Sequence, residues 1–258
     1  MKTRLLNTLR GRSRPDRGAP VPDDAVQHDA DLKKLPPLER KVVDAALPNS
    51  ITSVPRLLAV VNAVRYCERR GLDGAFAECG VWRGGSVLAM ILTLQDLGAE
   101  RDIWLYDTFE GMTEPTDEDT SEFHRPALET WQETEGGPAW PEYFSPEVFN
   151  EEGVRKTLLS TGYPEERLHF VRGPVEETIP GTVPDRLALL RLDTDWYEST
   201  RHELVHLYPL LADGGVLIID DYGHWEGCRR AVDEYFDSDA SPLLLNRVDY
   251  SGRMAIKH

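Results

Sequence analysis

What the sequence lacks excludes several classes of protein. It holds only three cysteines, Cys67, Cys79 and Cys228, an odd number without CxxC pairs or zinc-ligand spacing. A disulfide framework is therefore excluded, and we expect buried, reduced thiols and a cytoplasmic location. Neither a signal-peptide core nor a stretch of roughly 18 apolar residues occurs, so we expect no membrane association.

Positive charge is also scarce, because 29 Lys and Arg residues face 45 Asp and Glu residues, for a formal net charge of -16. A nucleic-acid-binding protein needs a basic surface, so this imbalance argues against such a partner. The one basic stretch lies near the N-terminus. Residues 1–35 are rich in Arg, Pro and Asp with little apolar periodicity, and we expect a disordered or loosely ordered arm there.

The remaining residues, 36–258, suffice for one α/β domain. Short apolar runs alternate with helical patterns, which is typical of a doubly wound, mostly parallel sheet. Strands are predicted at 75–80, 102–107, 168–172, 188–193 and 216–221, and a closing antiparallel hairpin at 243–247 and 254–257. Helices are predicted at 38–47, from about 55 to 70, and at 87–97, 201–211 and 227–236. Thr52 or Ser53 would cap the second of these helices, with Pro55 in its first turn.

Residues 112–150 interrupt this alternation. The stretch is acidic and contains four large aromatic residues, Trp131, Trp140, Tyr143 and Phe144. A connection this long inside one domain is usually a lid, a binding loop or a disordered segment. The aromatic residues favour a lid that covers a substrate.

Two pairs of carboxylates follow two apolar runs. Asp193 and Asp195 follow Leu187–Leu192, and Asp220 and Asp221 follow residues 216–219. Neighbouring parallel strands would bring all four to one rim, where ligands bind in open α/β sheets. Such clustered negative charge is costly without a cation, and hard oxygen ligands favour Mg²⁺. The simpler alternative is that these residues are turn and helix-capping residues.

A glycine-bearing turn follows the first predicted strand. Gly80 would let a ligand approach the backbone closely, and Gly84 or Gly85 would permit a positive φ or tight packing. Ser86 lies near a helix N-terminus, which favours anions. The spacing is neither GxGxxG nor a P-loop, but Asp107 ends the next strand about twenty residues later, where an acid suits ribose hydroxyls. Turn and acid together indicate an adenosine-type cofactor.

These residues resemble the class I S-adenosylmethionine methyltransferases, and more narrowly the macrocin O-methyltransferase family, which methylates sugar hydroxyls of antibiotic glycosides. The matching stretches span roughly residues 50–230 in the family's order. They are Thr52-Ser-Val-Pro-Arg56, Ala63-Val-Arg-Tyr66, Ala77-Glu-Cys-Gly-Val-Trp-Arg-Gly-Gly-Ser86, Asp107-Thr-Phe-Glu-Gly-Met112, Leu190-Arg-Leu-Asp-Thr-Asp-Trp-Tyr-Glu-Ser-Thr200, Ile219-Asp-Asp-Tyr-Gly223 and Gly227-Cys-Arg229.

The resemblance implies a Rossmann-like methyltransferase sheet, S-adenosylmethionine as cofactor, a Mg²⁺ ion (or Mn²⁺ or Ca²⁺ in its place), a small-molecule glycoside as acceptor and a homo-oligomer. The cofactor would be bound by Thr52, Ser53, Glu78, Gly80, Ser86, Asp107, Thr108, Phe109 and Gly173. The metal ligands would be Asp193, Asp220 and Asp221, and Asp195 would be the general base.

Several alternatives stay open. Catechol-type relatives usually carry Asp-Asn on the second metal strand and a lysine base, whereas this chain has Asp220-Asp221 and Trp196, which favours a sugar or another aliphatic diol over a catechol-like acceptor. Asp193-Thr-Asp195 also reads as the DxD motif of a glycosyltransferase or, less well, of a phosphatase. A non-catalytic cofactor-binding module is a further alternative. Asp195 could be a metal ligand instead of a base, and His224 could contact the substrate.

Overall fold

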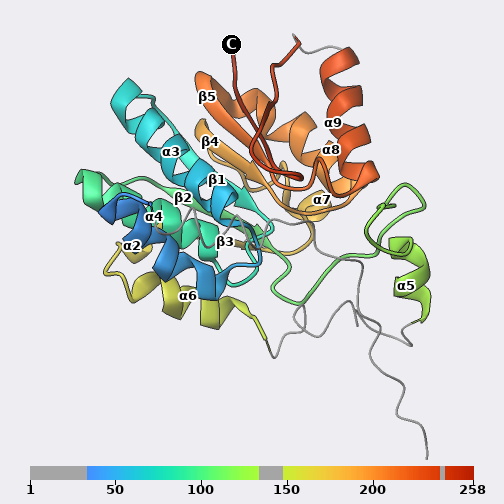
Figure 1. The fold of residues 1–258 in the computed structure, drawn as a ribbon, viewed down its shortest axis with the longest axis horizontal. Coiled ribbons are helices and arrows are strands. Elements are labelled where there is room, and N and C mark those ends of the chain that lie inside the picture. Colours follow the sequence, from blue (N-terminus) through green and yellow to red (C-terminus); the bar gives the residue numbers. More distant parts are fainter. Residues whose placement is uncertain (1–33, 134–147, 239–241) are drawn as a thin grey trace, which may run out of the picture.

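A seven-stranded sheet in the order β3-β2-β1-β4-β5-β7-β6 organises the fold (Figure 1). The computed structural model describes residues 34–133, 148–238 and 242–258, so the predicted arm lies almost entirely outside the described residues. Strands β1 to β5 are parallel, and β7 and β6 close the sheet as an antiparallel hairpin, as predicted. The strands are β1 Ala75–Cys79, β2 Ile103–Asp107, β3 Leu168–Arg172, β4 Leu187–Leu192, β5 Leu211–Ile219, β6 Asn246–Arg247 and β7 Arg253–Ile256.

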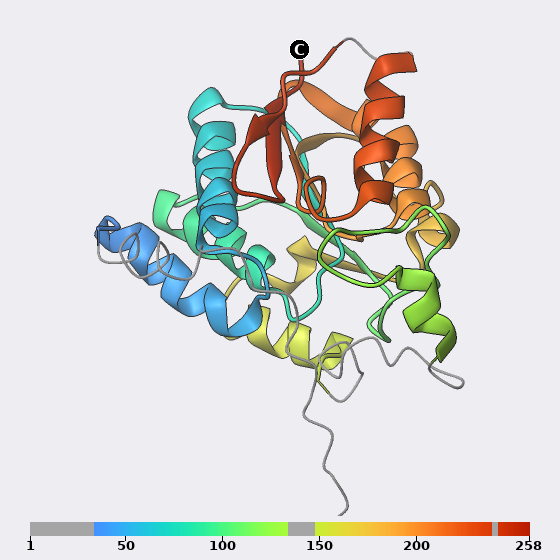
Figure 2. The same ribbon diagram turned by 45° about the vertical axis from the view of Figure 1, so that its right-hand side comes forward.

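Helices cover both faces of the sheet (Figure 2). On one face α2, α3, α4 and α6 pack on side chains such as Phe76 of β1, and on the other α7, α8 and α9 pack on side chains such as Ala77. Alternate residues of each strand thus enter different cores, which is the doubly wound arrangement. The helices are α2 Pro37–Ala46, α3 Val54–Arg70, α4 Gly85–Leu97, α5 Ala127–Glu133, α6 Glu151–Leu159, α7 Val175–Thr178, α8 Tyr197–His206 and α9 Glu226–Ser238.

Strand register brings the residues of interest to one rim. Cys79 of β1 pairs with Tyr106 of β2 and with Leu192 of β4, and Leu192 pairs with Ile219 of β5. The residues that follow these positions, Gly80, Asp107, Asp193 and Asp220, therefore stand side by side at the carboxyl ends of four adjacent strands. The predicted convergence of the acidic pairs is confirmed.

The predicted helix at 201–211 was displaced. Helix α8 begins at Tyr197 and ends at His206, a 3-10 turn covers Tyr208–Leu210, and Leu211 begins β5. Pro209 has no backbone N–H to continue a helix, and its fixed φ suits the short turn. Strand β5 consequently begins five residues before the predicted start at 216, and its extension passes through two glycines that carry no apolar signal.

The predicted lid contains secondary structure that the sequence did not indicate. Helix α5 lies within it and carries Trp131, whereas Trp140, Tyr143 and Phe144 lie outside the described residues. Helix α6 was also missed, because only Val154 and Leu158 of its nine residues are buried.

All three cysteines are buried and unpaired, as predicted. No helix in the described part of the chain is long and apolar enough to cross a membrane.

Candidate active site

A cavity of about 860 Å³ opens at the carboxyl ends of the parallel strands. Its lining includes nine of the residues predicted to act in the site, which are Thr52, Gly80, Asp107, Thr108, Gly173, Asp193, Asp195, Asp220 and Asp221. Four other predicted residues, Ser53, Glu78, Ser86 and Phe109, are not part of this lining, and all of them except Ser53 are buried. The cavity is therefore the meeting point of the predicted cofactor and metal residues.

Three carboxylates form a tight group in this cavity. One oxygen from each of Asp193, Asp220 and Asp221 lies within 4.8 Å of the other two. Asp220 and Asp221 are only 2% and 7% exposed. Burial raises the pKa of Asp193 to about 7 and that of Asp221 well above its usual value, and the neighbouring carboxylates add to both shifts. A bound cation would relieve this repulsion.

Arg191 of β4 forms ion pairs with two of these carboxylates and with Glu78. Its guanidinium is 1% exposed and pairs with Glu78, with Oδ2 of Asp193 at 2.7 Å, and with Asp220. Desolvation of a buried arginine is costly, and carboxylates on three sides offset that cost. The sequence predicted a cofactor role for Glu78, and the structure gives it this ion pair. An arginine inside the apolar run Leu-Ala-Leu-Leu-Arg-Leu was the available signal for a buried charge.

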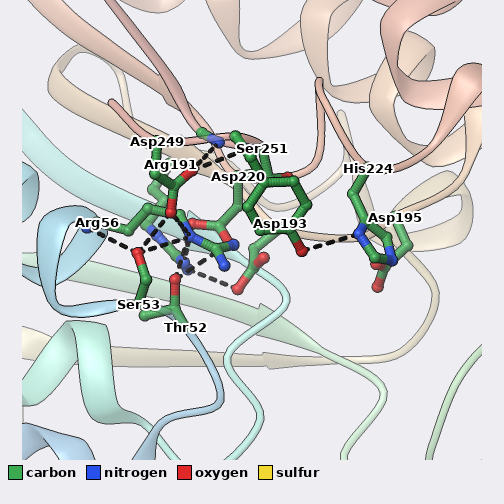
Figure 3. Close-up of polar contacts among 12 residues, drawn as sticks. Thr52, Ser53, Arg56, Arg191, Asp193, Asp195, Asp220, His224, Asp249 and Ser251 are labelled. Atoms are coloured by element: carbon green, nitrogen blue, oxygen red, sulfur yellow. Dashed lines mark hydrogen bonds and ion pairs between the residues drawn. The ribbon is translucent and has the colours of Figure 1, made fainter. Parts of the chain in front are cut away.

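Arg56 of α3 is a second arginine that contacts the carboxylates of the site. It pairs with Asp220, and its Nε donates to Oδ2 of Asp249 at 3.0 Å (Figure 3). Thr52 donates its hydroxyl to Asp220 at 3.3 Å. Ser53 caps α3 by accepting from the Arg56 N–H at 3.3 Å, and it donates to Asp249 at 2.5 Å. The predicted cap is confirmed, whereas cofactor binding by Thr52 and Ser53 stays a prediction.

Glycines in the turn after β1 allow close backbone packing. A Cβ on Gly80, where φ is +79°, would lie 1.9 Å from the carbonyl oxygen of Asp193, so the close approach there is made by the chain itself. A Cβ on Gly85 would lie 2.5 Å from the carbonyl oxygen of Asn49. Gly84 has the positive φ of +83°. Ser86 is buried in the first turn of α4.

Asp107 forms hydrogen bonds with the turns that follow β1 and β2. Its carboxylate accepts from the backbone N–H groups of Val81 at 2.7 Å, Trp82 at 2.9 Å and Phe109 at 2.7 Å. These bonds use part of the acceptor capacity of the carboxylate, and ribose binding by Asp107 stays a prediction. The backbone carbonyl of Asp107 also accepts from the N–H of Gly173 at 3.0 Å.

Two predicted neighbours of Asp107 have different environments. Thr108 lines the cavity, and its hydroxyl donates to the Gly111 carbonyl at 2.6 Å. Phe109 is 2% exposed, with its ring 6.0 Å from that of Phe170, so it belongs to the core behind the cavity. Both residues lie beyond the end of β2, and Phe109 adopts a positive φ of 53°, so the turn and not strand alternation sets the direction of its side chain.

Asp195 is held in a defined orientation beside the carboxylate group. Its backbone adopts φ +66°, and its Oδ1 accepts from Nε1 of Trp225 at 2.7 Å. Burial, followed by the charge of Asp193, raises the pKa of Asp195 to about 8. Asp195 does not belong to the group of three mutually close ligand atoms found among the described residues.

Glu203 of α8 was not predicted, and it supports the loop between Asp193 and Asp195. Its side chain is fully buried, and its Oε1 accepts from the Thr194 hydroxyl at 2.9 Å. Burial raises the pKa of Glu203 well above its usual value. Nothing in its helical context distinguished Glu203 from a surface residue.

Comparisons with known proteins show the family to which the chain belongs. The macrocin O-methyltransferase (TylF) family profile matches residues 40–255. The 8-demethyl-8-(2,3-dimethoxy-alpha-L-rhamnosyl)-tetracenomycin-C 4'-O-methyltransferase of Streptomyces olivaceus is 37% identical over 197 residues, which are 74% of this chain and 70% of that one. Mycinamicin III 3''-O-methyltransferase of Micromonospora griseorubida is 32% identical over 206 residues, 79% of this chain and 76% of that one.

A solved structure shows the same fold. The O-methyltransferase NovP superposes with a TM-score of 0.70 at 28% identity, and the match covers 81% of this chain and 82% of NovP. The family match spans most of the chain and includes the whole carboxylate group. The chain therefore belongs to the macrocin O-methyltransferase family and is an O-methyltransferase, for which the family implies S-adenosylmethionine as the methyl donor.

Proposed function

We propose that this protein methylates a sugar hydroxyl of a natural-product glycoside, with a divalent cation, Mg²⁺ by preference, held by Asp193, Asp220 and Asp221. The observation that carries the proposal is the grouping of these three carboxylates within 4.8 Å inside the cavity. The names of the relatives support the acceptor class, since one refers to a rhamnosyl group on tetracenomycin C and both are O-methyltransferases of natural products.

The charges of the site fit a hard cation. Two guanidiniums, Arg56 and Arg191, are surrounded by more carboxylates than they can neutralise, because Asp195, Asp221 and Asp249 lie near the three acids that Arg191 contacts. Within the described parts of the chain, no hydrogen-bond donor reaches the carboxylate of Asp221. A buried carboxylate without a donor and an all-oxygen ligand set suit Mg²⁺ better than Zn²⁺.

The half of the cavity formed by β1, β2 and β3 fits the cofactor. Gly80, Thr108 and Gly173 line it, and Asp107 keeps acceptor capacity for a ribose hydroxyl. Bound here, S-adenosylmethionine would supply an electrophilic methyl group. The cavity lies in the upper part of the volume range of small-molecule sites, so it has room for an acceptor as well.

Asp195 is the proposed general base. Trp225 holds its Oδ1, while its Oδ2 accepts no hydrogen bond from the residues that the structure describes. An aliphatic hydroxyl is a very weak acid, and a cation on the three carboxylates would stabilise negative charge on the acceptor oxygen. Asp195 would take the proton as the oxygen attacks. The rigid rim would contribute by holding the reactants in line.

Methyl transfer to defined acceptors tests this proposal. The protein is incubated with S-adenosylmethionine and Mg²⁺ together with either methyl α-L-rhamnopyranoside, a set of rhamnosylated natural products, or pyrocatechol. S-adenosylhomocysteine formation and the mass of the product are measured. We expect monomethylated glycosides. Methylation of pyrocatechol with none of any glycoside would refute the sugar assignment and favour a catechol-like acceptor.

A further inference from the structure

The half of the cavity formed by β4, β5 and the closing hairpin has a different chemistry from the cofactor half. His224 and Trp225 line it just beyond β5, Tyr250 lines it from the hairpin, and His124 lines it from the segment that follows β2. Phe123 is not part of the cavity lining, and its ring stacks on that of His224. We call these five residues the aromatic wall. They come from three segments that only the tertiary structure brings together.

His224 is held firmly within the wall. Its Nδ1 lies 3.0 Å from the Tyr250 hydroxyl, and its ring stacks on Phe123 at 5.2 Å with an interplanar angle of 10°. Within the described residues, no protein group is bonded to the other ring nitrogen, Nε2. In Figure 3, His224 and Asp195 both lie to the right of Asp193. His224 thus offers the cavity one hydrogen-bonding atom in a fixed orientation.

Trp225 connects the wall to the proposed base. Its Nε1 donates to Asp195 at 2.7 Å, and its ring lies 5.8 Å from that of His124 at an interplanar angle of 27°. A ligand lying on this surface therefore lies next to Asp195 and the three metal ligands. A ligand bound to the wall could therefore place a hydroxyl oxygen near both the proposed base and the proposed cation.

The chemistry of the wall suits a neutral sugar ring. A pyranose has apolar C–H faces, which pack against aromatic rings, and hydroxyls that need donors and acceptors. The wall provides both kinds of contact. The surplus of carboxylates beside it would repel an anionic acceptor such as a nucleotide-linked sugar. In the described segment that follows β2, the one cation that lines the cavity is Arg125. Its side chain is exposed and pairs with Glu129 and Glu133.

We propose that the aromatic wall is the acceptor subsite, where a neutral pyranose packs on the rings and receives a hydrogen bond from, or donates one to, Nε2 of His224. This inference rests on the proposed function and specifies the residues that select the acceptor. His224 and Tyr250 act together, because the Tyr250 hydroxyl fixes the ring whose other nitrogen meets the sugar.

The test compares His224→Ala, His224→Gln and Tyr250→Phe with the wild type. Methyl α-L-rhamnopyranoside is the probe, with Mg²⁺ and S-adenosylhomocysteine present in saturation-transfer NMR and S-adenosylmethionine in kinetics. Tyr197→Phe is the matched control, because that hydroxyl bonds to Glu234 on the surface at 2.7 Å. dTDP-L-rhamnose is the anionic comparison. Calorimetry with S-adenosylhomocysteine shows whether each variant retains a folded cofactor site.

We expect His224→Ala to raise the KM for the probe by roughly tenfold or more, Tyr250→Phe by about two- to tenfold, and His224→Gln to recover part of the loss. Tyr197→Phe should match the wild type, and cofactor affinity should not change in any variant. If His224→Ala binds no cofactor, Tyr250→Phe decides. Tighter binding of dTDP-L-rhamnose than of the neutral probe would overturn the inference.

Failure of the inference is distinguishable from failure of the proposed function. A wild type that binds and methylates the probe while both wall variants keep its KM overturns the subsite alone. A fall in kcat at unchanged KM also overturns it, since His224 would then act in the chemical step. A wild type that methylates neither sugar nor glycoside and shows no saturation transfer overturns both.

Discussion

Replacing Arg191 by leucine should destabilise the protein more than any surface ion-pair change. The guanidinium is 1% exposed and is the common partner of Glu78, Asp193 and Asp220. Leucine suits the apolar strand in shape and hydrophobicity, so packing changes little. What the substitution removes is the counter-charge for the carboxylates of Glu78, Asp193 and Asp220.

The expected magnitude follows from the burial of the partners. Removing one member of a buried ion pair costs about 3–5 kcal/mol, because the other charge is left without compensation. In a protein of this size, 1 kcal/mol corresponds to roughly 2–4 °C in Tm, so we expect a fall of roughly 6–20 °C. The matched control is Arg167→Leu. Arg167 is 37% exposed and pairs with Glu100 and Asp102 at 3.1 and 3.3 Å, and its loss should cost about 0–1 kcal/mol.

The assay is chemical and thermal denaturation followed by circular dichroism, without added metal. A second arm adds Glu78→Gln to Arg191→Leu, which removes one of the stranded charges. We expect this double variant to be more stable than Arg191→Leu alone, so that the two changes are not additive. A loss below 1 kcal/mol for Arg191→Leu, or full additivity with Glu78→Gln, would refute the view that Arg191 balances the charges of the site.

The other predictions concern ligands. Mg²⁺ at about 100 times its Kd should raise the free energy of unfolding by about 2.7 kcal/mol, and Asp221→Asn should lose this stabilisation. EDTA should abolish turnover, and full activity in EDTA would exclude the metal role. Asp195→Asn should lower kcat by about 10²–10⁴-fold while Mg²⁺ affinity is kept, and Asp193→Asn should weaken the metal; equal metal loss in both would make Asp195 a ligand. Asp107→Ala should weaken S-adenosylmethionine binding by about 1–3 kcal/mol in calorimetry, and an unchanged affinity would remove Asp107 from the cofactor site.

Local patterns were enough to predict the strands and the residues that follow them. Buried parallel strands have a distinctive run of apolar residues, and parallel direction alone places Asp107, Asp193 and Asp220 at one edge. The helix start at Ser53 was readable for the same reason, since a cap depends on its own three or four neighbours. The glycine turn after β1 was also a local signal, although its contact with the Asp193 backbone was not.

Long-range partners were decided only by tertiary structure. The pairing of Arg56 with Asp220 joins residues 164 positions apart, and Ser53 meets Asp249 across 196 positions. Gly80 was predicted to let a ligand approach the backbone closely, whereas the residue after β4 brings the Asp193 carbonyl next to it. Whether Asp107 serves a ribose or its own turns depends on backbone N–H groups whose directions no residue pattern specifies.

Local patterns thus predicted which residues reach the rim of the sheet, because each strand and the residue that follows it can be recognised from neighbouring residues alone. Strand order and register decided which of them touch. They paired Arg191 with three acids, joined the hairpin to α3 through Asp249, and brought together the segments of the aromatic wall, such as Phe123 with His224. Such contacts depend on how separate elements pack, and packing is a property of the whole fold.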